Sequence, residues 1–139
     1  MEDFTMNGGF VSGILNFGLY LGTALAVCAV FIYVYTHLTP YKELELIRNG
    51  NAAAACSLGG AIIGFVLPVA SVIANSVGVV DVVIWSLVAM AIQILLFLVI
   101  WKRFSDIVTN IHEGQNSSGI FLGALSIAIG IVNASCLTY

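Results

Sequence analysis

Charged residues are scarce in this chain, and their scarcity excludes most classes of soluble protein. Only 8% of the 139 residues are charged and 60% are hydrophobic, whereas ordinary globular chains carry about 25% charged residues. Four Lys and Arg residues are too few for the clustered basic surface that nucleic-acid binding requires, so we expect no nucleic-acid partner. The composition predicts that the lipid bilayer is the main partner of this protein.

Cysteine, histidine and catalytic patterns are also sparse. Cys28, Cys56 and Cys136 are odd in number and lack C-x-x-C spacing, so we predict buried thiols and neither a metal site nor a cofactor. His37 and His112 could sense pH or bind a metal, but no carboxylate or cysteine accompanies them in the pattern of a metal site, and we expect both to be solvated. We find no nucleophile elbow, phosphate loop or zinc-binding H-E-x-x-H, and therefore predict that the protein is not an enzyme.

Long apolar runs dominate what remains. Four stretches reach the roughly 20 helical residues that crossing a bilayer requires. They comprise residues 10–36, 51–76, 81–101 and 117–138. Because the alternating pattern of a barrel is absent, the predicted fold is an all-α membrane protein with four transmembrane helices. Residues 1–9 are expected to form a short tail outside the cytoplasm, without the basic segment of a signal peptide.

The four basic residues lie in two of the connecting segments. Lys42 and Arg48 separate the first two spans, and Lys102 and Arg103 separate the last two. Since cytoplasmic loops carry the excess of Lys and Arg, both loops are predicted to be cytoplasmic and both termini to lie outside. The sequence thus predicts a multi-pass protein of a bacterial inner (plasma) membrane.

The second half of the chain repeats the first. An offset of 64 positions pairs Gly50 with Gly114 and Gly59 with Gly123, and it also superposes the basic loops. Residues 10–76 and 77–139 are therefore predicted to be tandem two-helix repeats in parallel orientation. The alternative is two similar hairpins that share only a membrane composition.

Both basic loops are predicted to contain a short helix at the cytoplasmic interface. In the first, Thr39 can cap a helix that begins at Pro40 and ends at Gly50. Leu44 and Ile47 lie one turn apart and are expected to face the bilayer or the bundle. In the second loop, the residues with helical spacing are Phe104, Ile107, Val108 and Ile111.

Small residues at four-residue steps predict close helix packing, because membrane helices gain no hydrophobic free energy from touching each other. The candidate packing residues are Gly18, Gly22, Gly60, Gly64, Gly119 and Gly123. Four thin helices are expected to bury part of these faces in a homo-oligomer. Pro68, inside the second span, cannot donate to the Gly64 carbonyl and is either a hinge or a tolerated kink.

No Asp, Glu, Lys or Arg lies deep within a predicted span, which disfavours a proton-driven transporter. The neutral polar residues within the spans are Gln93, Ser71, Asn75, Asn133 and Ser135. They could line an outward-facing cavity or a narrow pore. Alternatively, each makes an interhelical hydrogen bond worth about 0.6–2 kcal/mol.

Several short runs are characteristic of one family. HLTP at 37–40 leads to ELIRNGNAA at 45–53, followed by GFVLP at 64–68, Ile92-Gln93 and VNASCLTY at 132–139. Over almost its whole length the chain resembles the YjfL family of small bacterial inner-membrane proteins. The resemblance implies duplicated two-helix units and, through neighbouring genes, a link to envelope stress or polyamine physiology. It implies no activity, substrate or functional residue.

Two functions are compatible with these features. The first is a small oligomeric scaffold or sensor, linked to envelope physiology, that recruits a cytoplasmic protein through the basic loops. The alternative is a passive pore or carrier for ions or small neutral solutes, lined by Gln93 and the outer amides.

Overall fold

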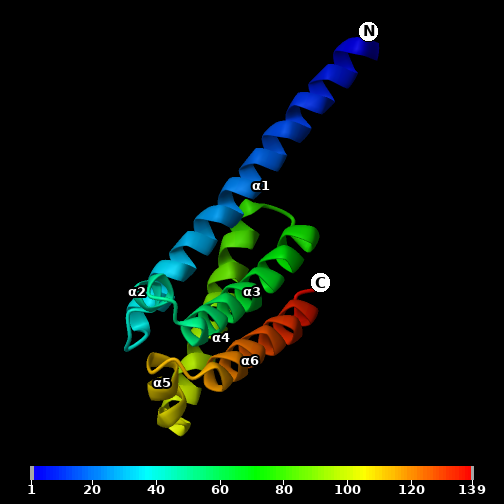
Figure 1. Ribbon diagram of the computed structural model, residues 1–139. Coiled ribbons are helices and arrows are strands. Elements are labelled where there is room, and N and C mark those ends of the chain that lie inside the picture. The colour runs from blue at the N-terminus through cyan, green and yellow to red at the C-terminus, as the bar shows by residue number, and fades with distance from the viewer. Residues whose placement is uncertain (1, 139) are drawn as a thin grey trace.

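The computed structural model describes residues 2–138, and the side chains of residues 7–138. The described chain folds into helices connected by short turns (Figure 1). The helices are α1 (Glu2–Leu38), α2 (Glu43–Arg48), α3 (Ala52–Asn75), α4 (Val79–Arg103), α5 (Ser105–His112) and α6 (Asn116–Cys136). Four of them, α1, α3, α4 and α6, are long and apolar enough to cross a membrane, which confirms the predicted all-α fold with four candidate spans.

The short helices α2 and α5 lie at the same end of the bundle (Figure 1). We call this end, formed by residues 39–51 and 102–115, the loop end. The turn between α3 and α4 and the C-terminal end of α6 lie at the opposite end. The bundle therefore has one end built from short polar helices and turns, and another built from a tight turn and a chain terminus.

Helix α1 is longer than its neighbours. Its 37 residues span roughly 55 Å at about 1.5 Å per residue, which exceeds the ~30 Å hydrocarbon core of a bilayer. The helix is continuous from Glu2, so the predicted tail of residues 1–9 is helical where it is described; no proline interrupts it. Its N-terminal part projects past the α3–α4 turn, with Phe10 71% exposed (Figure 1).

Glycines bring the backbones of α3 and α6 into direct contact. A Cβ added to Gly60 would lie 2.3 Å from the Cα of Gly123, and one added to Gly119 would lie 2.2 Å from the carbonyl oxygen of Ala53. A Cβ on Gly130 would likewise meet the carbonyl oxygen of Gly64 at 2.2 Å. Since the contacting positions increase together along both helices, α3 and α6 pack in parallel.

Aromatic side chains attach α1 to α3 and α4. Phe31 stacks on Phe65 of α3, with ring centroids 4.3 Å apart, and Tyr35 meets the edge of Phe97 of α4 at 5.5 Å. These residues are buried, whereas Gly18 and Gly22 of α1 have nothing within 4 Å of an added Cβ. The predicted packing face of α1 at Gly18 and Gly22 therefore has no partner within the described chain, whereas Tyr20, Ala24 and Val27 already pack against the bundle.

The two loop helices end in the same backbone geometry. Gly50 and Gly114 have φ values of +88° and +84°, a region that glycine adopts without strain. The amide of Asn51 donates to the carbonyl of Leu46, and the amide of Gln115 donates to that of Asn110, both at 2.9 Å. These hydrogen bonds correspond at the same offset of 64 positions that relates the two halves of the sequence.

The backbone contact predicts a sharp difference between two adjacent glycines of α3. Gly60→Ala should destabilise the bundle by about 1–3 kcal/mol, because the added methyl group forces α3 and α6 apart. Gly59→Ala should be neutral or stabilise by up to about 1 kcal/mol, because no atom lies within 4 Å and alanine favours the helix. Denaturant unfolding of both variants in micelles measures the difference, and equal stabilities would contradict the contact.

Candidate functional site

Two of the five predicted polar residues of the spans make hydrogen bonds between helices. Gln93, which is 1% exposed, donates through Nε2 to the carbonyl of Ser126 on α6 at 2.9 Å. Its amide fills the space over Gly64, where an added Cβ would lie 2.5 Å from Nε2. Ser71 donates its hydroxyl to the carbonyl of Ala134 at 2.9 Å. These two residues connect α6 to α4 and to α3.

The other polar candidates lie near the ends of α3 and α6. Asn75 donates to the carbonyl of Ser71, and Ser135 donates to that of Ile131, each within its own helix. Asn133 is nearly buried, and its amide nitrogen has no hydrogen-bond partner within the described residues. The structure therefore does not join Asn75 and Asn133 by a hydrogen bond.

Pro68 is buried within an uninterrupted α3. Its missing N–H leaves the carbonyl of Gly64 without the usual intrahelical donor. That carbonyl lies against the backbone of Gly130, which has no side chain to block the approach. The freed carbonyl is thus covered by α6, and the surroundings of Pro68 are those of a packed helix interface.

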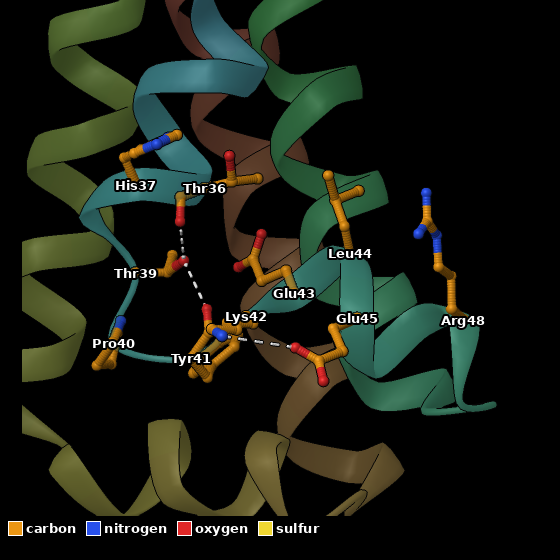
Figure 2. A pocket seen from close by; sticks show the side chains of 10 residues that line it. All are labelled: Thr36, His37, Thr39, Pro40, Tyr41, Lys42, Glu43, Leu44, Glu45 and Arg48. Atoms are coloured by element: carbon orange, nitrogen blue, oxygen red, sulfur yellow. Dashed lines mark hydrogen bonds and ion pairs between the residues drawn. The ribbon is translucent and has the colours of Figure 1, made fainter.

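The polar and hollowed surface of the protein lies at the loop end. A pocket of about 800 Å³ opens between the end of α1 and α2 (Figure 2). Its lining residues are Thr36, His37, Thr39, Pro40, Tyr41, Lys42, Glu43, Leu44, Glu45 and Arg48. Smaller pockets adjoin it and extend the hollow along α5, where His112 contributes to each of them.

The turn between α1 and α2 differs from the sequence prediction. Helix α2 begins at Glu43, not at Pro40. The hydroxyl of Thr39 lies 3.1 Å from the carbonyl oxygen of Thr36 and 3.2 Å from that of Tyr41, so it holds these residues in a turn instead of capping a helix. Leu44, predicted to face the bilayer or the bundle, is 53% exposed and so does not pack into the bundle, whereas Ile47 is half-buried.

The predicted basic residues surround this pocket or lie beside it. Lys42 and Arg48 are exposed, and Lys42 pairs weakly with Glu45 at 3.9 Å. Lys102 and Arg103 are exposed at the end of α4, where the guanidinium of Arg103 lies 5.5 Å from the Phe104 ring. All four basic residues are therefore accessible from the loop end.

Glu43 is the residue that sequence reasoning missed. It is only 1% exposed and is the one residue of α2 that is fully buried. Figure 2 shows its carboxylate directed toward the end of α1, whereas Arg48 points away. The signal in the sequence was the helical period, since Glu43 lies one turn before Leu46 and Ile47, which are half-buried on the same face.

Three hydroxyl groups accompany this carboxyl group. The hydroxyl of Tyr41 lies near enough to the Glu43 carboxylate and to the Ser57 hydroxyl to interact with both, and the hydroxyl of Tyr35 is close enough to feel the charge of Glu43. None of these buried oxygen atoms makes a hydrogen bond of standard geometry. We call Tyr35, Tyr41, Glu43 and Ser57 the Glu43 cluster.

Burial controls the acidity of this cluster. It raises the pKa of Glu43 from 4.5 to about 8, and the Tyr41 hydroxyl opposes that rise. Burial and the neighbouring Glu43 also raise the pKa of Tyr41. The cluster can therefore exchange a proton near pH 8.

Asn51 joins the two loops at this end. Its side-chain oxygen accepts the amide of Ala54 at 2.9 Å and so caps α3. Its side-chain nitrogen donates to the carbonyls of Ile111 and His112, at 3.0 and 3.3 Å. One asparagine thus fixes the end of α5 against the start of α3, and the loop end forms one connected surface.

Comparison with known proteins places the chain in a family. The family model described as Domain of Unknown Function (DUF350) matches residues 9–137, nearly the whole chain. The chain belongs to the DUF350 family. The UPF0719 inner membrane proteins YjfL of Escherichia coli strains K12 and O157:H7 are each 31% identical to it over 129 residues, covering 93% of this chain and 98% of the relative. No solved structure matches.

Membership in the DUF350 family confirms the resemblance found in the sequence and the inner-membrane location. The four apolar helices make this family member a multi-pass membrane protein. Family membership assigns no activity, so functional inference rests on the geometry of the loop end and of the helix contacts.

The hydrogen bond of Gln93 generates a testable expectation. Gln93→Leu should lower the free energy of unfolding by about 0.6–2 kcal/mol, because α4 loses its bond to α6. Gln115→Leu is a matched control, since Gln115 is exposed and its side chain caps nothing. Denaturant unfolding in micelles compares them, and an effect at position 93 no larger than at 115 would exclude a structural role.

Proposed function

We propose that this protein is a non-enzymatic, oligomeric membrane sensor that recruits a cytoplasmic protein partner through its loop end. The observation that carries the proposal is a division of polar groups. Within the spans, Gln93 and Ser71 are used in helix–helix hydrogen bonds. At the loop end, exposed charged side chains surround a pocket of about 800 Å³. This division favours a protein that presents a surface over one that passes a solute.

The orientation of the loop end supports this reading. Lys42, Arg48, Lys102 and Arg103 all lie there, and cytoplasmic loops carry the excess of Lys and Arg. We therefore assign the loop end to the cytoplasm and both termini to the outside. A cytoplasmic partner would then meet the pocket, α2 and α5 together, because Asn51 joins the two loops.

The corresponding turns support an internal duplication. Gly50 and Gly114 adopt the same positive φ and terminate equivalent short helices. We interpret residues 10–76 and 77–139 as two parallel repeats whose second helices, α3 and α6, pack against each other. Parallel repeats place both loops on one side of the membrane, as a two-loop docking surface requires.

The pore alternative finds less support. Gln93 is bonded to Ser126, and the backbones of α3 and α6 touch at three glycine contacts. A passage between these helices would have to break the hydrogen bond and separate the backbones. The exposed N-terminal part of α1, with Gly18 and Gly22 unoccupied, instead offers a face for a second copy of the chain.

The orientation can be tested with two single-cysteine variants in a background in which Cys28, Cys56 and Cys136 are replaced by alanine. Val77→Cys, in the turn between α3 and α4 where Val77 is 96% exposed, should react with a membrane-impermeant thiol reagent added outside intact cells. Arg48→Cys should react only after the membrane is permeabilised. The reverse labelling pattern would place the loop end outside.

The function is tested by crosslinking and flux together. A photo-crosslinking residue at position 109 should give one discrete protein adduct in cells, whereas the same residue at position 77 should not. Arg48→Glu or Lys102→Glu should reduce an adduct formed from position 109, on the exposed side of α5, by tenfold or more. Proteoliposomes should leak ions and small solutes no faster than empty liposomes.

The opposite results would be equally clear. Solute flux above empty liposomes that Gln93→Leu abolishes would identify a pore and overturn the sensor proposal. Adducts that both charge reversals leave unchanged would exclude recruitment through the basic residues.

A further inference from the structure

The Glu43 cluster presents an unexplained concentration of buried polar atoms. Both carboxylate oxygens of Glu43 and the hydroxyl oxygens of Tyr35, Tyr41 and Ser57 are sealed from solvent without a hydrogen bond of standard geometry. Buried polar groups are nearly always paired, so each exception requires an explanation. Four side chains from α1, the turn, α2 and α3 converge on this point, which makes it a built arrangement and not a single misplaced side chain.

The side chains around the carboxyl group supply hydroxyls and no neutralising partner. Lys42, adjacent in sequence, points to solvent and pairs with Glu45. Tyr35 on α1 and Tyr41 in the turn lie close to the carboxyl group itself. The other titratable and charged groups of the surrounding elements line the pockets beside it; they are His37 on α1, Lys42 in the turn, Glu45 and Arg48 on α2, and His112 on α5. Of these groups, Tyr35 and Tyr41 are close enough to interact with the Glu43 charge, and neither phenol supplies a positive charge.

An ionised carboxylate in this position would be buried without a cation, which is strongly unfavourable. A neutral carboxylic acid costs far less, and its O–H can donate to a tyrosine or serine oxygen while the neighbouring hydroxyls donate to its carbonyl oxygen. The carboxylate oxygens have almost no solvent-accessible surface, so only a very small species can reach them. The ligand that matches these constraints is a proton.

We propose that Glu43 is a proton-binding site and that its protonation keeps α2 docked on the bundle. Uptake of one proton converts the carboxylate to the carboxylic acid, and release returns the proton to the cytoplasmic solvent. Glu43 is the buried residue of α2, and Leu46 and Ile47 are half-buried beside it. The protonation state of Glu43 therefore determines how strongly this six-residue helix packs against the bundle. Cytoplasmic pH would then be the signal to which the proposed sensor responds; the proton site itself does not depend on that proposed function, but its physiological role does.

The direction of the response follows from the raised pKa of Glu43 in the docked state. Below pH 4.5 the carboxyl group is protonated whether α2 is docked or released, so docking is at its strongest. Between pH 4.5 and about 8 the released form loses its proton while the docked form keeps it, and docking weakens as pH rises. Above about pH 8 the docked form is also ionised and the weakening is complete. Alkaline conditions therefore release α2 and open the pocket that it lines.

The titration itself can be observed by infrared difference spectroscopy on protein in lipid nanodiscs, with isotope-labelled glutamate. The wild-type protein should show the carbonyl band of a protonated glutamic acid that disappears with a midpoint near pH 8. Glu43→Gln should lack this band, and Glu45→Gln, a neighbouring exposed position on the same helix, should retain it. If Glu43→Gln fails to fold, the variants Glu2→Gln, Glu45→Gln and Glu113→Gln assign the band by elimination.

The docking of α2 is measured by hydrogen exchange of its backbone amides across the same pH range. The amides of Leu46, Ile47 and Arg48 lie beyond the substituted residue, so their intrinsic exchange rates are essentially the same in wild type and Glu43→Gln at each pH. The ratio of the two observed rates at these amides therefore reports docking. The ratio should stay near one in acid and rise by up to about tenfold for each pH unit between pH 4.5 and about 8. Glu45→Gln should follow the wild type.

These outcomes separate the site from the proposed function. A glutamate band that has vanished by pH 5, or exchange of α2 that follows Glu43→Gln at every pH, would overturn the proton site even if partner adducts are found. A titrating band with coupled exchange, in a protein that forms no partner adduct, would retain the proton site and refute recruitment.

Discussion

The direct contact between the backbones of α3 and α6 is the constraint on which the rest of this structure depends. Helices in lipid gain little from burying apolar side chains against each other, so the contact relies on close approach. Glycines at positions 60, 64, 119, 123 and 130 permit that approach. Gln93 can reach Ser126 because α4 packs against this pair, and the carbonyl released by Pro68 is covered because Gly130 lies over it.

The parallel packing of α3 and α6 determines the shape of the loop end. Since α3 and α6 run in parallel, the turns that precede them lie side by side, and Asn51 can bond to the last carbonyls of α5. The two short helices therefore form one surface and not two independent loops. Helix α1, attached by Phe31 and Tyr35, then brings the α1–α2 turn over α3, where Tyr41 and Glu43 are enclosed.

Glu43 shows how a membrane protein without charges deep within its spans can still contain a buried titratable group. The carboxyl group lies in a connecting segment, yet the fold removes it from water and surrounds it with hydroxyls. A rigid bundle combined with one acid of raised pKa concentrates the response to pH in a six-residue helix. Such a device needs no moving transmembrane helix, because only the connecting segment has to dock or release.

The sequence by itself determined the class of protein, the four spans and the position of the basic residues. Apolar run length and loop charge are local properties of the chain, and they decide which segments cross a bilayer and which loops stay in the cytoplasm. The family followed from short sequence motifs. Tertiary structure decided which small residues pack: Gly60 and Gly123 meet, while Gly18 and Gly22, equally suitable in sequence, meet nothing. It also decided that Gln93 is bonded and that Glu43 is buried. Those outcomes depend on the rotation and start of each helix, which are set by contacts between residues distant in the sequence. The helical period places Glu43 on the face of Leu46 and Ile47, but only the tertiary contacts bury that face.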